Sequence, residues 1–83
     1  MAGDLHLIDI DVRMHGSLRR FLAGGVASVQ LAACEGVTVR WVAEQFRAED
    51  EVWLSSIGQN IVPMSMPLTY DVTLDFFPIL AGG

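Results

Sequence analysis

The residues that could carry chemistry in this 83-residue chain lie at its end, in the stretch DFFPILAGG. Two glycines in the last two positions mark either a frayed end or a functional one, and they present the carboxylate of Gly83. Gly82 and Gly83 have no Cβ, so their backbone can enter a narrow site and adopt the φ that the site requires. Fully extended, residues 79–83 span at most about 17 Å, which lets this carboxylate reach a partner while a folded body stays outside.

Other reactive side chains are few. Cys34 is the only cysteine, so it forms no disulfide within the chain, and a lone small thiol is expected to be an inert, buried side chain. His6 and His15 have no cysteine or carboxylate cluster at ligand spacing, which argues against a metal site. The sequence offers no convincing catalytic base, so we do not expect the chain to be an enzyme by itself.

The composition predicts one domain with an acidic surface. Hydrophobic residues make up 52% of the chain, enough for a core, and the net charge of −5 argues against nucleic acid and fits a partner with a basic docking surface. No apolar run reaches the roughly 18 residues of a membrane helix, and the start MAGDLHLIDIDV does not read as a signal peptide. These two observations and the single cysteine together favour a location of the protein in the cytoplasm. The chain has no lysine, so it offers no side-chain amine for amide bonds.

The elements that must position the tail begin with two strands. Residues 6–14 (HLIDIDVRM) and 26–33 (VASVQLAA) alternate apolar and polar side chains, and we expect them to pair as a hairpin with a long connection. In that connection Ser17 is expected to cap a short helical turn, which Gly24 and Gly25 end. The expected core residues are Ile8, Ile10, Val12, Met14, Leu18, Phe21, Leu22, Val29, Leu31 and Ala33.

The stretch EGVTVRWVAEQF predicts the main helix. Thr38 lies where an N-cap belongs, and four apolar residues recur at the spacing of one helix face. These are Val39, Val42, Ala43 and Phe46. Trp41 falls about 160–200° from that face, which predicts that it packs on the loop around Trp53 or contacts a partner.

Three further strands are predicted after the helix. They are EVWLSSI at 51–57, a short IVP at 61–63 and YDVTLDFF at 70–77, which places Val72, Leu74 and Phe76 on the core face. Pro63 and Pro67 lack the amide hydrogen of a central ladder, so that stretch is expected at an edge, with Leu68 as an apolar plug. The first and last strands alternate most strongly and are placed together in the centre. This predicts an α+β, β-grasp roll like ubiquitin, with a mixed four- to five-stranded sheet and one main helix. The expected domain spans residues 1–78, followed by a tail at 79–83.

From Ser56 onward, the chain resembles the C-terminal part of the β-grasp sulfur carriers and is most similar to the small subunit of molybdopterin synthase. The features that carry the likeness are Gln59-Asn60 in a turn, the apolar pair Ile61-Val62, Pro67-Leu68, the closing strand from Val72 to Phe77, Pro78 and Gly82-Gly83. The thiamin sulfur carrier is a close cousin. The sequence departs from the family before the closing strand, where an acidic Asp-Gly-Asp turn is replaced by Thr69-Tyr70-Asp71.

The resemblance implies a cycle of activation at Gly83. A ubiquitin-activating-type enzyme would use ATP to adenylate its carboxylate, a sulfur donor would convert it to a thiocarboxylate, and a second enzyme, such as the molybdopterin synthase large subunit, would take the sulfur. Activation is needed because a carboxylate oxygen is a poor leaving group, whereas adenylate is a good one. Ala81 and Gly82 would form the thin arm of the tail, and the carrier itself would bind no cofactor.

Docking to these enzymes needs a surface of its own. We expect Phe77, Pro78, Ile79 and Leu80 to form an exposed apolar anchor, and the alternative is that they only cover the bottom of the sheet. The pathway stays open, because thiamin and other thio-metabolite carriers share these features. A ubiquitin-like modifier would instead join Gly83 to lysines of other proteins. In a plain interaction domain the two glycines would be incidental.

Overall fold

The alternating segment at the start of the chain forms strand β1, Leu7–Met14, in the computed structural model, which describes residues 6–79. Its apolar side chains are buried and its polar ones lie on the opposite face, as a period of two predicts. The remaining elements follow in chain order. They are the 3-10 helices η1, Gly16–Phe21, and η2, Ala23–Gly25; strand β2, Ser28–Cys34; helix α1, Val39–Gln45; and strands β3, Val52–Ile57, β4, Asn60–Val62, and β5, Val72–Pro78.

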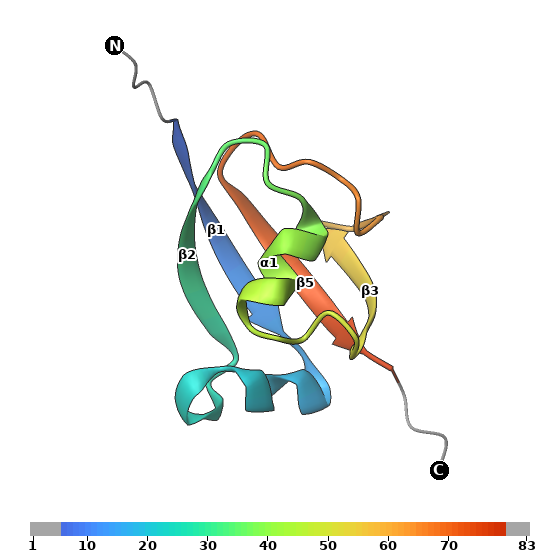
Figure 1. Ribbon diagram of the computed structural model, residues 1–83. Coiled ribbons are helices and arrows are strands. Elements are labelled where there is room, and N and C mark those ends of the chain that lie inside the picture. The colour runs from blue at the N-terminus through green and yellow to red at the C-terminus, as the bar shows by residue number, and fades with distance from the viewer. Residues whose placement is uncertain (1–5, 80–83) are drawn as a thin grey trace.

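The five strands form one mixed sheet in the order β2-β1-β5-β3-β4. The first and last strands, β1 and β5, are parallel neighbours in its centre, and the other pairings are antiparallel. Figure 1 shows α1 crossing one face of this sheet. This arrangement confirms the predicted α+β, β-grasp roll, including the central position of the two terminal strands. Within residues 6–79, no helix is long and apolar enough to cross a membrane.

Helix α1 is held at its start by a side-chain cap and by a neighbouring loop. The Thr38 hydroxyl accepts a hydrogen bond from the Trp41 backbone N–H at 3.1 Å, so the predicted N-cap is confirmed. The loop between β4 and β5 supplies the carbonyls of Met66 and Met64, which accept from the N–H groups of Val39 and Arg40. These first-turn N–H groups have no partner within a helix, so the loop satisfies donors that would otherwise be left open.

The core lies between α1 and the sheet. Val39, Val42 and Ala43 are fully buried, as the helix periodicity predicted. Leu68 is also buried, and its backbone exchanges hydrogen bonds with Val37 and Gly36, which confirms it as a plug under the loop. Trp41 is half-buried and packs against the edge of this core.

The predicted cap of the first helical turn is wrong. His15, not Ser17, occupies the N-cap position of η1, and no side chain makes a capping hydrogen bond there. The chain turns into η1 directly after β1, because Gly16 adopts a φ of +56°. Ser17 therefore lies inside the helix instead of before it. The turn buries Leu18 as expected.

Two expectations for β2 also differ from the structure. Val29 faces the helix side of the sheet but is 36% exposed, because β2 is the outermost strand on its side. Cys34 is exposed, so the prediction of an inert, buried thiol is wrong. The alternation along β2 explains this, because Ala33 faces the core and the next side chain must therefore face the opposite way.

Candidate functional site

The C-terminal tail begins at the end of the central strand β5. The last residue of this strand, Pro78, still pairs with Val52 of β3, and the Ile79 N–H donates a hydrogen bond to the carbonyl of Glu51 at 3.2 Å. The backbone is thus bound into the sheet up to Ile79. Leu80, Ala81, Gly82 and Gly83 lie outside the described residues, so the reactive role of the Gly83 carboxylate stays a prediction.

We call residues 77–79, from which the tail leaves the sheet, the tail root. A histidine from near the start of the sequence covers it. His15 follows β1, and its Nε2 lies 2.7 Å from Oδ1 of Asp75. Because an ionised carboxylate only accepts hydrogen bonds, the imidazole N–H is the donor in this pair. The same ring stacks on Phe77 with centroids 4.4 Å apart and planes 9° from parallel. The His15 backbone N–H also donates to the carbonyl of Phe76, which fixes the residue beside β5.

The structure divides the predicted apolar anchor into covered and open parts. Phe77 points away from the core face as predicted, but it is half-buried because His15 covers one side of its ring. Pro78 is also half-buried, and a Cβ added at Gly16 would lie 3.2 Å from its Cγ. Ile79 is 55% exposed. Partner contact by this anchor remains a prediction, and Ile79 is its most open member among the described residues.

The sheet face opposite α1 is acidic where β1 and β5 lie side by side. Asp9 and Asp11 come from β1, and Asp71 and Asp75 come from β5 or the residue just before it. The Asp71 carboxylate accepts a hydrogen bond from the Asp9 backbone N–H at 2.9 Å, which ties the residues before β5 to β1. An open hollow of about 400 Å³ lies among Asp9, Asp11 and Asp71. We call these four carboxylates the acidic sheet face.

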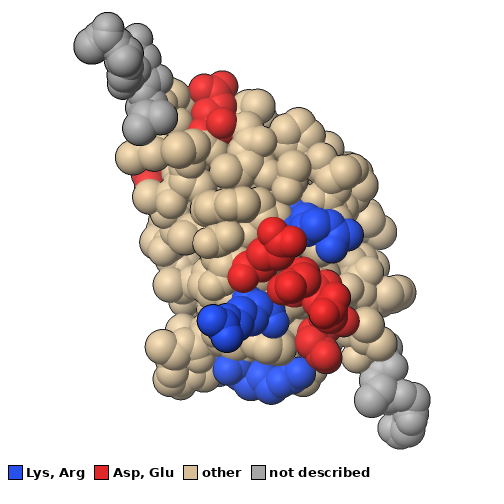
Figure 2. All heavy atoms as spheres, viewed as in Figure 1, with Lys and Arg blue, Asp and Glu red and all other residues tan. Residues whose placement is uncertain are grey.

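The helix side of the molecule carries both signs of charge. Figure 2 shows acidic and basic side chains intermixed there, over the lower half of the view. The acidic sheet face also contains a cation, because Arg13 lies on the same face of β1 and opposite Asp75 in the register with β5. Its Nε lies 3.3 Å from the Asp11 carboxylate, so this face is acidic in balance but not uniformly so.

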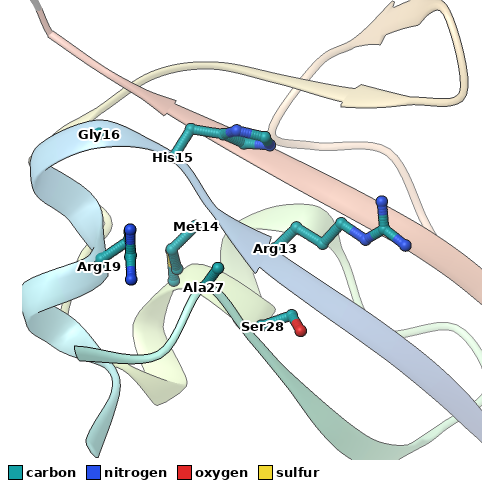
Figure 3. A pocket seen from close by; sticks show the side chains of 7 residues that line it. All are labelled: Arg13, Met14, His15, Gly16, Arg19, Ala27 and Ser28. Carbon is teal, nitrogen blue, oxygen red and sulfur yellow. The ribbon is translucent and has the colours of Figure 1, made fainter. Parts of the chain in front are cut away.

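A second hollow, also of about 400 Å³, lies where β1 ends and β2 begins. Arg13, His15 and Arg19 contribute basic side chains to it, and Figure 3 shows the two arginines on either side of Ala27 and Ser28. Arg13 Nε bonds the Asp11 carboxylate at 3.3 Å, and Arg19 Nε donates to the Gly25 carbonyl at 3.1 Å. We call this feature the basic hollow.

Residues 6–79 contain no group of three or more His, Cys, Asp or Glu placed to hold a metal ion. The role of His15 was missed at the sequence level, where only metal ligation was considered for it. The predicted neighbourhood of the first and last strands brings their ends together, but only the register in the structure shows which residues meet. The register aligns Met14 with Phe76, so the next pair is His15 and Phe77.

No protein-family model matches this chain, and no curated protein matches it significantly in sequence. Its fold is similar to that of a Pyrococcus furiosus protein described as a candidate molybdopterin converting factor, subunit 1, with a TM-score of 0.69 and 17% identity over 88% of this chain and 99% of the other. It is also similar to a Haloferax volcanii protein whose structure was solved in solution, with a TM-score of 0.75 and 20% identity over 100% of this chain and 93% of the other. At these identities the likeness shows the fold, which is the β-grasp fold that the sequence predicted.

Proposed function

We propose that this protein is a sulfur carrier whose Gly83 carboxylate is adenylated and then converted to a thiocarboxylate, with molybdopterin synthesis as the receiving pathway. The observation that carries this proposal is the position of β5. The strand that precedes Gly82-Gly83 is a central one, bonded on one side to β1 and on the other to β3. The chain end to which we assign the chemistry therefore follows the middle strand of the sheet, which is hydrogen-bonded on both sides. The fold shared with the Pyrococcus furiosus protein supports the same assignment.

In this proposal the domain positions the tail and the partner enzymes carry out the chemistry. The Gly83 carboxylate attacks the α-phosphate of ATP held by the activating enzyme, and pyrophosphate leaves. Sulfide from a donor then attacks the acyl carbon, the bond from that carbon to the phosphate oxygen breaks, and AMP leaves. The domain holds the start of the tail through the stack of His15 on Phe77 and the last sheet hydrogen bond at Ile79. Fixing this root reduces the freedom that the tail loses when it enters a partner's site.

The acidic sheet face supports recognition by a basic partner. It runs along β1 and along β5, the strand that carries the tail. Of its carboxylates Asp75 lies near the tail, and Asp71 lies at the other end of β5. Opposite charges steer two proteins together and orient them on encounter. Ile79 adds an exposed apolar side chain at the point where the chain leaves the sheet. We therefore propose that the activating enzyme contacts this face and receives the tail beside it.

Mass spectrometry of the intact protein tests the proposal. The chain is incubated with its cognate activating enzyme, ATP and a sulfur source, and the expected mass shift corresponds to one oxygen replaced by one sulfur. Omission of ATP and deletion of Gly83 should each abolish the shift. Gly82→Val should also abolish it, because a branched side chain blocks entry to a narrow site. The matched control is Gly3→Val at the other end of the chain, which should react normally.

An unchanged mass with an activating enzyme of demonstrated competence would contradict the proposal. The same tail could instead serve a ubiquitin-like modifier, and denaturing, reducing immunoblots of cell lysate separate these two functions. A single band at the monomer mass fits a carrier, whereas a ladder of conjugates fits a modifier. Adding the thiocarboxylated protein to a molybdopterin synthase large subunit or to a thiamin-forming enzyme then identifies the sulfur acceptor.

A further inference from the structure

The two edges of the sheet are protected very differently. β4 forms one edge with only three residues and is followed by Pro63, features that stop another strand from pairing. β2 forms the other edge with seven residues, SVQLAAC, which include no charge, proline or glycine. Its register with β1 runs without a bulge from Ser28 to Cys34. Charges, prolines and bulges are the usual means of blocking edge pairing, so β2 is an open edge.

The hydrogen bonds of the hairpin show which backbone groups of β2 point outward. The Met14 N–H donates to the Ala27 carbonyl, and the Glu35 N–H donates to the His6 carbonyl. Antiparallel pairs alternate between bonded and non-bonded, so odd-numbered residues of β2 bond to β1. The even-numbered residues therefore direct their N–H and C=O groups away from β1. They are Ser28, Gln30, Ala32 and Cys34.

We propose that β2 pairs in antiparallel fashion with β2 of a second copy of this chain, and so joins two sheets into one. Only one symmetric register uses all four outward-pointing residues. It places Ser28 opposite Cys34 of the second copy, Gln30 opposite Ala32, and Leu31 opposite itself. Each pair of outward-pointing residues then exchanges two N–H···O bonds. The inference is independent of the proposed sulfur chemistry.

Charge complementarity is the reason for assigning a second copy of this chain as the partner. One step beyond the Ser28–Cys34 pair, the register places Glu35 of the second copy opposite Ala27. Ala27 lines the basic hollow together with Arg19, whereas Arg13 lines it from the sheet face opposite α1 (Figure 3). Arg19 uses Nε for its hydrogen bond to the Gly25 carbonyl, and no partner is found for its terminal nitrogens among residues 6–79. Two-fold symmetry repeats this match of Glu35 with the basic hollow at the other end of the interface.

Apolar contact adds to the same interface. Val29 and Leu31 lie on the helix side of β2, where Val29 is 36% exposed and Leu31 is half-buried. Pairing across the edge brings Leu31 next to its own copy and covers part of both residues. The tail stays outside the interface, because β1 separates β2 from β5. Both tails of the dimer thus remain able to meet partners.

The first test measures the oligomeric state of the full chain by sedimentation equilibrium over a range of concentrations. The wild type is expected to show a reversible dimer. Ala32→Pro removes an N–H that β1 does not use, so the hairpin can still form while the dimer weakens about tenfold or more. Gln30→Lys places a charge at the edge without changing the backbone and should act in the same direction. Ile61→Lys makes a comparable change on the opposite edge strand and should leave the dimer intact.

The outcomes of this test decide the proposal. A wild type that stays monomeric up to millimolar concentration overturns it. A dimer that survives Ala32→Pro and Gln30→Lys, with folding checked by amide NMR spectra, overturns it as well. Loss of the dimer in Ile61→Lys would place the interface on β4 and would also contradict the proposal. Glu35→Arg should weaken the dimer, and adding Arg19→Glu should restore part of the affinity.

A second test checks the register by disulfide formation. In the proposed pairing the Cα atoms of residue 28 and residue 34 of the second copy lie about 5.5 Å apart, which is within disulfide range. When oxidised glutathione is added, two copies of Ser28→Cys should therefore become linked by disulfides between residue 28 and residue 34. Each pair of protein thiols is oxidised while one glutathione disulfide is reduced to two glutathione molecules. The wild type serves as control, because its two Cys34 residues would lie about 20 Å apart along the paired strands. A dimer in solution without this cross-link overturns the register.

Discussion

The imidazole ring of His15 lies flat on the phenyl ring of Phe77, with ring centroids 4.4 Å apart and planes 9° from parallel. The two residues are far apart in sequence and meet because β1 and β5 run in parallel. His15 also binds Asp75, so one side chain contacts two positions of the strand that leads to the tail.

His15→Ala should lower the free energy of unfolding by about 1 kcal/mol, because it removes both the aromatic stack and the hydrogen bond to Asp75. His15→Phe keeps a ring on Phe77, so its free energy of unfolding should fall less than that of His15→Ala. Urea unfolding followed by tryptophan fluorescence measures both. His6→Ala is the control, since His6 is exposed and uses its backbone carbonyl in the sheet. Equal stability of His15→Ala and His6→Ala would show that the stack contributes nothing.

Gly16→Ala should destabilise the protein more than Gly58→Ala. Both glycines have positive φ, +56° and +63°, so both substitutions force a side chain into a left-handed conformation at a cost of roughly 1–2 kcal/mol. Only at Gly16 does the added Cβ meet another group, the Pro78 ring at 3.2 Å. Chemical unfolding of the two variants isolates this contact with the tail root. If both lose the same free energy, Pro78 moves aside without cost.

Leu68→Ala should destabilise the protein by about 2–5 kcal/mol, because it leaves a cavity under the loop between β4 and β5. Leu68 is 3% exposed, and its backbone binds both Val37 and Gly36. A domain of this size has modest stability, so the variant should show a much lower melting temperature. Ile61→Ala, at a side chain 70% exposed, should change stability by about 0.5 kcal/mol or less.

Thr38→Ala should cost about 1 kcal/mol, because the N–H of Trp41 loses its side-chain acceptor at the start of α1. Thr38→Ser retains a hydroxyl and should restore most of the loss. Thr69→Ala, at an exposed position in the loop before β5, controls for removal of a threonine elsewhere. Thermal unfolding followed by the helix signal in circular dichroism gives the melting temperature of each variant. A Thr38→Ser variant as unstable as Thr38→Ala would argue against the cap.

Asp9→Lys should slow formation of the thiocarboxylate by the activating enzyme at low salt, because it weakens the acidic sheet face. The expected reduction is up to about tenfold, and it should shrink at high ionic strength as charges are screened. Asp50→Lys makes the same change of charge at an exposed residue between α1 and β3. Rates are compared by mass spectrometry over a salt series. Equal effects of the two variants would show that net charge matters and the sheet face does not.

Local patterns in the sequence were sufficient to predict the elements. The alternation in β1, the cap at Thr38 and the prolines near β4 each report on a few adjacent residues, and each was confirmed. The central pairing of β1 with β5 was also predictable, because the two most alternating strands need the most burial.

The remaining features depend on contacts between distant parts of the chain. Phe77 was expected to be exposed, but its covering residue, His15, comes from the far end of the sequence. Cys34 was expected to be buried from residue type alone, although its place in the alternation of β2 predicts the opposite. The open edge of β2 depends on what fails to pair with it, and periodicity does not report that.

The parallel pairing of β1 with β5 also constrains when the protein can fold during synthesis. Both hairpins, β1–β2 and β3–β4, can form as soon as their strands have been made, but no segment before Val72 can join them into one sheet. A chain cut short before β5 would leave two separate hairpins that share no hydrogen-bonded strand. A folded body is therefore a sign that translation has reached at least Pro78. A partner that recognises the folded sheet would in this way reject most incomplete chains.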